Sequence, residues 1–165
     1  MKYLYLIRHA KSKKDSKRAN DFDRGLNCRG KKAVLKIAHA LKTKKIMPDL
    51  ILSSSAKRTK KTAKGLARKM GYKKRIIFLD DLYLAGPKTL LQIVQHIRKK
   101  HQTVFIVAHN PGITDFANQM MTDNTIKNIP TLGVAALQLP VQKWQECQHK
   151  IAKLEFFIYP KMYEK

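Results

Sequence analysis

Residues 103–112 have the sequence Thr-Val-Phe-Ile-Val-Ala-His-Asn-Pro-Gly, a continuous apolar run that ends at a histidine. An apolar run such as residues 103–108 is typical of a strand in the middle of a sheet, buried on both faces. After the Pro111-Gly112 turn, the pattern predicts a helix that reaches about Met121. The stretch therefore predicts a strand, a histidine at the strand's end and a helix.

Similar units are expected along the rest of the chain. Short apolar runs predict further strands at residues 3–7, 50–52, 76–79, 134–139 and 151–159. The stretches between them predict helices: one capped by Asn27, one capped by the serines at 53–55 and ended by Gly71, and one opened by Gly86-Pro87 that extends to Ile97. This alternation predicts an α/β fold with a mostly parallel central sheet, closed by two antiparallel strands. At 165 residues, we expect a single domain spanning 1–165.

Charge is the extreme feature of the composition. The chain has 35 Lys and Arg against 11 Asp and Glu, a formal net charge of +24, which favours anionic partners. Its two cysteines lie far apart without a CxxC spacing, which argues against a zinc site or a secreted disulfide framework. The apolar run at residues 3–7 is too short for a signal-peptide core, and no stretch could span a bilayer. We therefore expect a cytoplasmic protein with no membrane partner.

Basic and imidazole side chains follow the predicted parallel strands. Arg8 and His9 come directly after the first strand, Arg58 lies in the first turn after the second, and His109 follows residues 103–108. Ligands of open α/β sheets bind at this edge, beyond the carboxyl ends of the strands. Guanidinium groups bind phosphate oxygens, and a neutral imidazole is a competent nucleophile toward phosphorus. The pattern therefore predicts phosphoryl transfer in which the arginines supply the positive charge, without a metal.

Four ordered segments carry a family resemblance. They are residues 4–12 (LYLIRHAKS), residues 23–26 (DRGL) with Gly30, residues 53–59 (SSSAKRT) and residues 107–112 (VAHNPG). Their order and spacing resemble the histidine phosphatase (phosphoglycerate mutase-like) superfamily, in particular its compact SixA-type branch of phosphohistidine phosphatases. The match runs from residue 3 to about residue 115.

The resemblance implies a fold and a set of site residues. The fold is a three-layer α/β/α sandwich, and the pocket for the phosphoryl group is formed by Arg8, His9, Arg58 and His109, with His9 as the nucleophile. It also implies substrate contacts from Arg24, Ser12 and Asn110. No metal or organic cofactor is implied. Ser54 is interpreted as a helix cap, and Tyr83 and Trp144 as packing residues.

The chain departs from the superfamily pattern after the third strand. Most members place a general acid there, whereas residues 80–86 are Asp-Asp-Leu-Tyr-Leu-Ala-Gly and the acid position holds an apolar residue. An alkoxide leaving group needs a proton, but an imidazole protonated at its other nitrogen does not. This departure favours a phosphohistidine substrate, with Asp81 as an alternative acid.

Three functions remain open from the sequence. The first is hydrolysis of phosphohistidine, or a similarly activated phosphoryl group, on a protein through a covalent phosphohistidine at His9, with inorganic phosphate as the product. The second is a broad phosphatase for small phosphorylated metabolites, and the third is a basic nucleic-acid-binding protein with an idle pocket. The third lacks a recognisable RNA-binding motif. The lysine-rich residues 11–18 and 57–61 are expected to form either a positive rim for an anionic substrate or an ordinary basic surface.

Overall fold

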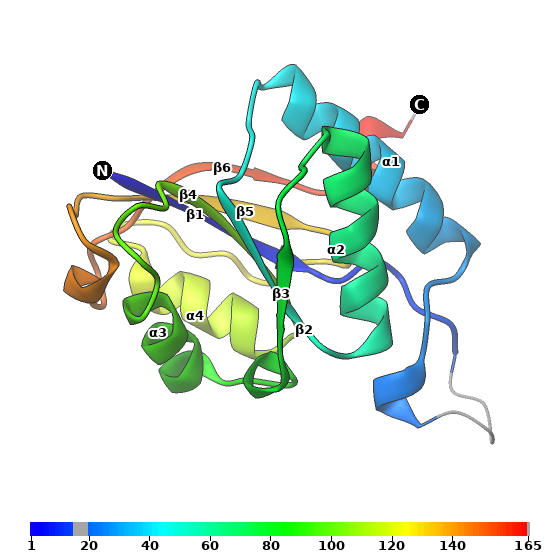
Figure 1. The fold of residues 1–165 in the computed structure, drawn as a ribbon, viewed down its shortest axis with the longest axis horizontal. Helices are drawn as coiled ribbons and strands as arrows, with labels where there is room; N and C mark the ends of the chain where they lie inside the picture. Colours follow the sequence, from blue (N-terminus) through cyan, green and yellow to red (C-terminus); the bar gives the residue numbers. More distant parts are fainter. Residues whose placement is uncertain (15–19, 165) are drawn as a thin grey trace.

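The computed structural model describes residues 1–14 and 20–164, in which helices flank one sheet (Figure 1). Residues 15–18 of the lysine-rich segment therefore lie outside the described residues. The strands are β1 Lys2–Arg8, β2 Leu50–Ser54, β3 Ile76–Leu79, β4 Thr103–Ala108, β5 Val134–Leu139 and β6 Lys153–Ile158. The α-helices are α1 Cys28–Thr43, α2 Lys57–Met70, α3 Pro87–Gln95 and α4 Gly112–Met120, and the 3-10 helices are η1 Asp21–Asp23, η2 Asp80–Leu82, η3 Trp144–Glu146 and η4 Pro160–Tyr163.

The strands of the described residues form a single sheet in the order β3-β2-β4-β1-β5-β6. The first four of these run parallel, whereas β5 runs antiparallel to both β1 and β6. The predicted α/β fold with a mostly parallel sheet is confirmed, and so is the antiparallel arrangement of the last two strands.

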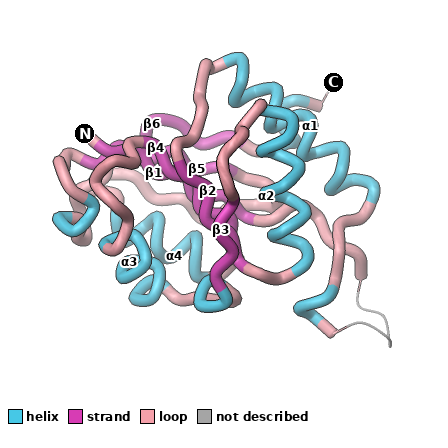
Figure 2. The backbone as a smooth tube through the Cα atoms, viewed as in Figure 1, coloured by secondary structure: helices cyan, strands magenta, loops and turns pink. Residues whose placement is uncertain are grey.

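Helices α1 and α2 lie on one face of the sheet and α3 and α4 on the other (Figures 1 and 2). Successive side chains of a strand point to opposite faces, and β1 follows this rule. Leu4 and Leu6 join the core beneath α3 and α4, whereas Tyr5 and Ile7 join the core beneath α1 and α2. The three-layer arrangement is therefore built from strands that are apolar on both faces.

The start of α2 differs from the prediction. β2 continues through Ser54, which pairs with Leu79 of β3, so two of the three serines lie in the strand. The N-cap residue of α2 is Ala56, and no side chain caps this helix. The predicted serine cap is wrong because pairing with β3 holds Ser54 in the sheet, and its hydroxyl has other partners, described below.

Other element ends agree closely with the sequence pattern. Asn27 caps α1 by accepting a hydrogen bond from the Gly30 amide, and Gly71 ends α2 in the left-handed conformation at φ 78°. Two predictions are too long: α3 ends at Gln95, before Ile97, and β6 begins at Lys153. No helix among the described residues is both long and apolar enough to cross a membrane.

Gly112, the first residue of α4, lies directly against the chain that precedes α3. A Cβ atom at this position would lie 1.8 Å from the Ala85 carbonyl oxygen, a contact with backbone that cannot move aside. We therefore expect Gly112→Ala to lower the free energy of unfolding by about 1–3 kcal/mol, measured by urea denaturation. Gly25→Ala is the matched control, since its Cβ would meet only the flexible Lys57 side chain at 3.4 Å. Equal stability of the two variants would contradict this account of α4 packing.

Candidate active site

Two histidines lie side by side where β1 and β4 end. The parallel register pairs Arg8 with Ala108, so the next residues, His9 and His109, leave the sheet at the same level. Their ring centroids are 5.4 Å apart, and the residues are only 8% and 2% exposed. The sheet therefore brings together two imidazoles that lie one hundred residues apart in sequence.

The position of the proton on His9 follows from its neighbours. Nδ1 lies 2.8 Å from the Ala10 carbonyl oxygen, which can only accept a hydrogen bond, so Nδ1 carries the proton. Nε2 is left with a lone pair, and the Arg58 Nε donates a hydrogen bond to it at 3.3 Å. Nε2 is thus the atom of His9 that can act as a nucleophile.

Arg58 connects the two histidines. It lies in the first turn of α2 and is 3% exposed. Its guanidinium contacts His9 through Nε and donates from Nη2 to the His109 Nδ1 at 3.2 Å. Two further donor bonds go to Asp21, from Nη1 to the backbone oxygen at 2.6 Å and from Nη2 to Oδ2 at 2.9 Å. The guanidinium is therefore fixed by contacts on three sides.

Ser54 orients His109. The His109 Nε2 lies 2.8 Å from the Ser54 Oγ, which also accepts a hydrogen bond from the Ala56 amide at 3.3 Å. Because Nδ1 accepts from Arg58, the ring proton is on Nε2 and is donated to the serine. The serine that the sequence analysis interpreted as a helix cap instead fixes the tautomer of a site histidine.

Burial keeps both imidazoles neutral. Desolvation, together with the positive charges of Arg58, Arg8 and Arg24 and against the opposing hydrogen bond to Ala10, lowers the pKa of His9 to about 4. Desolvation, followed by the charge of Arg58, lowers the pKa of His109 to about 3. At neutral pH both rings are therefore uncharged, the protonation state in which a histidine is nucleophilic.

Arg8 also faces the site from the end of β1. Its Nη1 donates to the Ile129 carbonyl oxygen at 3.2 Å. Its Nε is buried and has no hydrogen-bond partner among residues 1–14 and 20–164. Burial and the nearby charge of Arg58 lower the pKa of this guanidinium. Arg8 thus brings a second positive charge beside His9.

Arg24 and Ser12 reach the site through Asp21. The Arg24 Nη2 donates to the Asp21 Oδ1 at 2.5 Å, and its Nη1 donates to the Ser12 Oγ at 3.5 Å and to the Lys13 carbonyl oxygen at 3.3 Å. The Asp21 carboxylate therefore bridges Arg24 and Arg58, and among the hydrogen bonds of the described residues Ser12 contacts the site only through Arg24.

Asp21 was not predicted as a site residue, and Tyr83, predicted as a packing residue, packs against His109 and also contacts Asp21. The Tyr83 hydroxyl donates to the Asp21 Oδ2, and its ring packs edge-on against His109, with centroids 5.3 Å apart. This hydrogen bond, together with those from Arg24 and Arg58, holds the pKa of Asp21 well below its usual range. The spacing Asp21-x-x-Arg24 is the only sequence signal that could have pointed to this carboxylate.

The amide of Asn110 is occupied by other residues. Its Nδ2 donates to the Asn128 Oδ1 and to the Ile129 carbonyl oxygen, both at 2.9 Å, and its Oδ1 accepts from the Thr114 hydroxyl at 2.7 Å. In this structure Asn110 therefore holds the loop that carries Ile129, the partner of Arg8.

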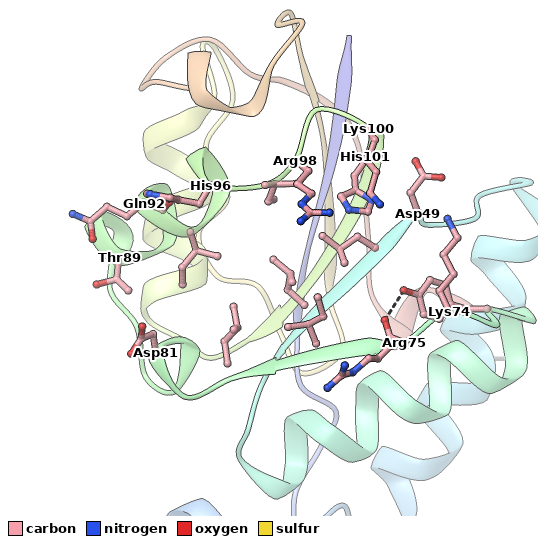
Figure 3. Close-up of a pocket in the computed structure, with 17 residues that line it drawn as sticks. Asp49, Lys74, Arg75, Asp81, Thr89, Gln92, His96, Arg98, Lys100 and His101 are labelled. Atoms are coloured by element: carbon pink, nitrogen blue, oxygen red, sulfur yellow. Dashed lines mark hydrogen bonds between the residues drawn. The ribbon is translucent and has the colours of Figure 1, made fainter.

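Asp81 lies away from the histidines. It is exposed and lines a separate cavity of about 760 Å³ between β2, β3 and α3, where Figure 3 labels it. Neither His9 nor His109 lines that cavity. The preceding residue, Asp80, accepts a hydrogen bond from the Ser55 hydroxyl. Among the described residues, no group of three or more histidine, cysteine, aspartate or glutamate side chains is arranged to bind a metal ion.

Comparisons with known sequences place the first half of the chain in one family. Residues 4–83 match the sequence model of the histidine phosphatase superfamily (branch 1). The chain is 31% identical over 152 residues to an uncharacterized chloroplastic protein of Arabidopsis thaliana, covering 87% of this chain and 69% of that protein. It is 26% identical over 149 residues to an uncharacterized protein of Mycobacterium leprae (strain TN), covering 86% and 89%.

Solved structures extend the similarity to nearly the whole chain. One assigned to the phosphohistidine phosphatase SixA of Agrobacterium tumefaciens has a TM-score of 0.83 and 29% identity, covering 96% of this chain and 98% of that one. The protein histidine phosphatase SixA complexed with tungstate has a TM-score of 0.85 at 16% identity, covering 98% and 99%, a likeness of fold.

The protonation of the two histidines can be tested in the ligand-free protein by ¹⁵N-edited NMR of the imidazoles. His9 is expected to remain the neutral Nδ1–H tautomer at pH 6 and to titrate near pH 4, below the ordinary 6.5. Because the folded pKa values lie below the unfolded ones, the unfolded chain binds more protons, and thermal stability should fall as pH drops from about 6.5 toward 4. Titration of either ring near 6.5 would contradict the electrostatic account.

Asp21 competes with any oxyanion for the guanidinium groups it contacts. A bound phosphate or vanadate needs the same donor atoms of Arg58 and Arg24, so we expect Asp21→Asn to tighten vanadate binding about three- to tenfold, measured by calorimetry. Asp23→Asn removes one negative charge from an exposed neighbour in η1 and serves as the control. If Asp21→Asn bound vanadate more weakly than the unaltered protein and Asp23→Asn did not, the carboxylate would mainly position the arginines.

Proposed function

This chain belongs to the histidine phosphatase superfamily, in its SixA-type branch, and we propose that it hydrolyses phosphohistidine on a protein substrate with His9 as the nucleophile. Membership implies a phosphatase, a hydrolase that acts on a phosphorylated substrate and releases phosphate. The observation that carries the finer proposal is the neutral His9, whose Nε2 lone pair faces Arg58, while the carboxylate that contacts this arginine, Asp21, is held ionised.

In the first step, the phosphoryl group moves from the substrate to His9. The Nε2 lone pair attacks phosphorus, the bond between phosphorus and the substrate nitrogen breaks, and its electron pair remains on the departing ring. A substrate imidazole that carries a proton on its other nitrogen leaves as a neutral molecule. His9 becomes phosphorylated on Nε2 and keeps the Nδ1 proton that it shares with the Ala10 carbonyl.

Arginines stabilise the charge on the transferred group. Arg58 has donors directed at both histidines, and a phosphoryl group placed between the rings replaces these contacts with bonds to its own oxygens. The buried Arg8 Nε supplies a further donor on the β1 side. His109 packs beside His9 and, held by Ser54, lines the opposite wall of the same space.

In the second step, water restores the enzyme. A water oxygen bonds to phosphorus, the bond from phosphorus to Nε2 breaks, and Nε2 regains its lone pair. Both water protons leave on dihydrogen phosphate, so His9 needs no proton from the protein. In a loose transition state the bond from water to phosphorus is only weakly formed. The water molecule therefore does not have to lose a proton to a base before it attacks.

The ionisation of Asp21 and the position of Asp81 favour a substrate whose leaving group needs no proton. Asp21, the carboxylate in contact with the site arginines, is held ionised by Tyr83, Arg24 and Arg58 and cannot donate a proton at neutral pH. Asp81 lies in another cavity, so it offers no route for protonating an alkoxide bound at His9. This arrangement favours a leaving group that departs without a proton over the alkyl phosphates of most metabolites.

The dependence on the leaving group can be measured with small substrates. We expect N-phosphoimidazole and aryl phosphates with acidic phenols to be hydrolysed at least about a hundredfold faster, in kcat/KM, than alkyl phosphates such as glycerol phosphate. Within a series of aryl phosphates, the rate should fall steeply as the phenol pKa rises. A weak dependence of the rate on the phenol pKa, with alkyl phosphates hydrolysed as fast as phosphoimidazole, would favour a broad metabolite phosphatase with its own general acid.

The nucleophile can be identified by trapping. His9→Ala should lower kcat by at least about a thousandfold, because the covalent route is lost. After an alkaline quench during turnover, mass spectrometry should find a phosphoryl group on His9 of the unaltered protein. His39→Ala, on the exposed face of α1, is the matched control and should remain active. A phosphoryl group on another residue, or full activity without His9, would rule out this mechanism.

A further inference from the structure

A second cavity, of about 400 Å³, lies between α1, η4 and the segment that follows β1. Five basic side chains line it, together with apolar and aromatic groups and one carboxylate, Glu164. We call it the basic cavity, and its five basic residues are Lys11, Arg29, Lys32, Lys36 and Lys161.

Three of these cations lie on one face of α1. Arg29, Lys32 and Lys36 have the spacing i, i+3 and i+7, which aligns their side chains along the helix over about 10 Å. Within residues 1–14 and 20–164, no ion pair joins any of the five basic residues to a carboxylate. The basic cavity therefore presents five cations and one carboxylate, Glu164, and none of the five is held in an ion pair within the described part of the chain.

The basic cavity and the catalytic site are connected by two segments of the chain. Lys11 follows His9 by two residues, and Thr131, which also lines the basic cavity, precedes Leu132. The Leu132 amide donates to the carbonyl oxygens of Arg8 and His9, both at 3.0 Å. The segments that hold the nucleophile thus continue directly into the basic cavity.

We propose that the basic cavity binds an acidic segment of the protein whose phosphohistidine reacts at His9, an inference that rests on the proposed function. A row of cations about 10 Å long matches several carboxylates along an extended chain better than one phosphate, which contacts only two or three donors. The Tyr159 ring and Pro130 offer apolar contact to the same segment. Complementary charge of this kind raises the rate of encounter and selects among substrates.

The test uses two synthetic peptides that carry the same phosphohistidine. In one, the flanking residues are Asp and Glu, and in the other they are Asn and Gln. The unaltered protein should hydrolyse the acidic peptide with a kcat/KM about tenfold higher or more, mainly through KM, and the preference should disappear at high salt.

Charge reversal locates the binding surface. The triple variant Arg29→Glu, Lys32→Glu and Lys36→Glu should lose the preference for the acidic peptide and hydrolyse phosphoimidazole normally. The control variant Lys73→Glu, Lys99→Glu and Lys153→Glu changes the net charge equally at exposed positions outside the basic cavity, and it should keep the preference. Equal loss in both triple variants would overturn the proposal in favour of a general effect of net charge.

Binding without catalysis separates this inference from the proposed function. Fluorescence anisotropy with the acidic peptide lacking its phosphoryl group should give weaker binding to the α1 triple variant than to the control variant. If that difference appears and no phosphohistidine is hydrolysed, the docking surface stands and the proposed reaction fails. If inorganic tripolyphosphate binds through the same three residues and the peptide does not, the basic cavity serves a small polyanion and the proposal is wrong.

Discussion

The parallel pairing of β1 with β4 is the constraint on which the site depends. Its register places Arg8 opposite Ala108, and the residues that follow become neighbouring imidazoles. A slip of one residue would turn the side chains of β1 to the opposite layers, exchanging the positions of Leu6 and Ile7 in two different cores. The position of His9 therefore depends on the apolar packing of both faces of β1 as well as on the contacts within the site.

Arg58 and burial set the electrostatics of this geometry together. A buried guanidinium between two imidazoles would repel them if they were charged, and desolvation already disfavours their charged forms. Because the rings are neutral, they accept hydrogen bonds from Arg58. If they were charged, they would attract anions themselves. The result is a positive pocket with uncharged imidazoles, and it arises because α2 begins where its first turn can place Arg58 between the two rings.

Strand ends were predictable from the sequence, and the path of the chain between them was not. Apolar runs that stop at Arg8 and at His109 indicate which side chains emerge at the edge of the sheet, and a parallel sheet brings such edges together. The roles of Asp21 and Tyr83 depend on how two irregular segments fold over that edge, for which no periodicity exists. Ser54 was misassigned because a serine before a helix is a frequent cap, and only pairing with β3 keeps it in the sheet.

The Asp21 carboxylate has a consequence for the charge that an entering anion meets. Its other hydrogen bonds, to Arg24 and Tyr83, hold it beside Arg58 in the ligand-free protein. An anion that enters the site therefore meets a guanidinium that already has a counter-ion, which lowers the net attraction for the anion. In a chain with such a large excess of lysine and arginine, this places one fixed negative charge among the arginines of the site.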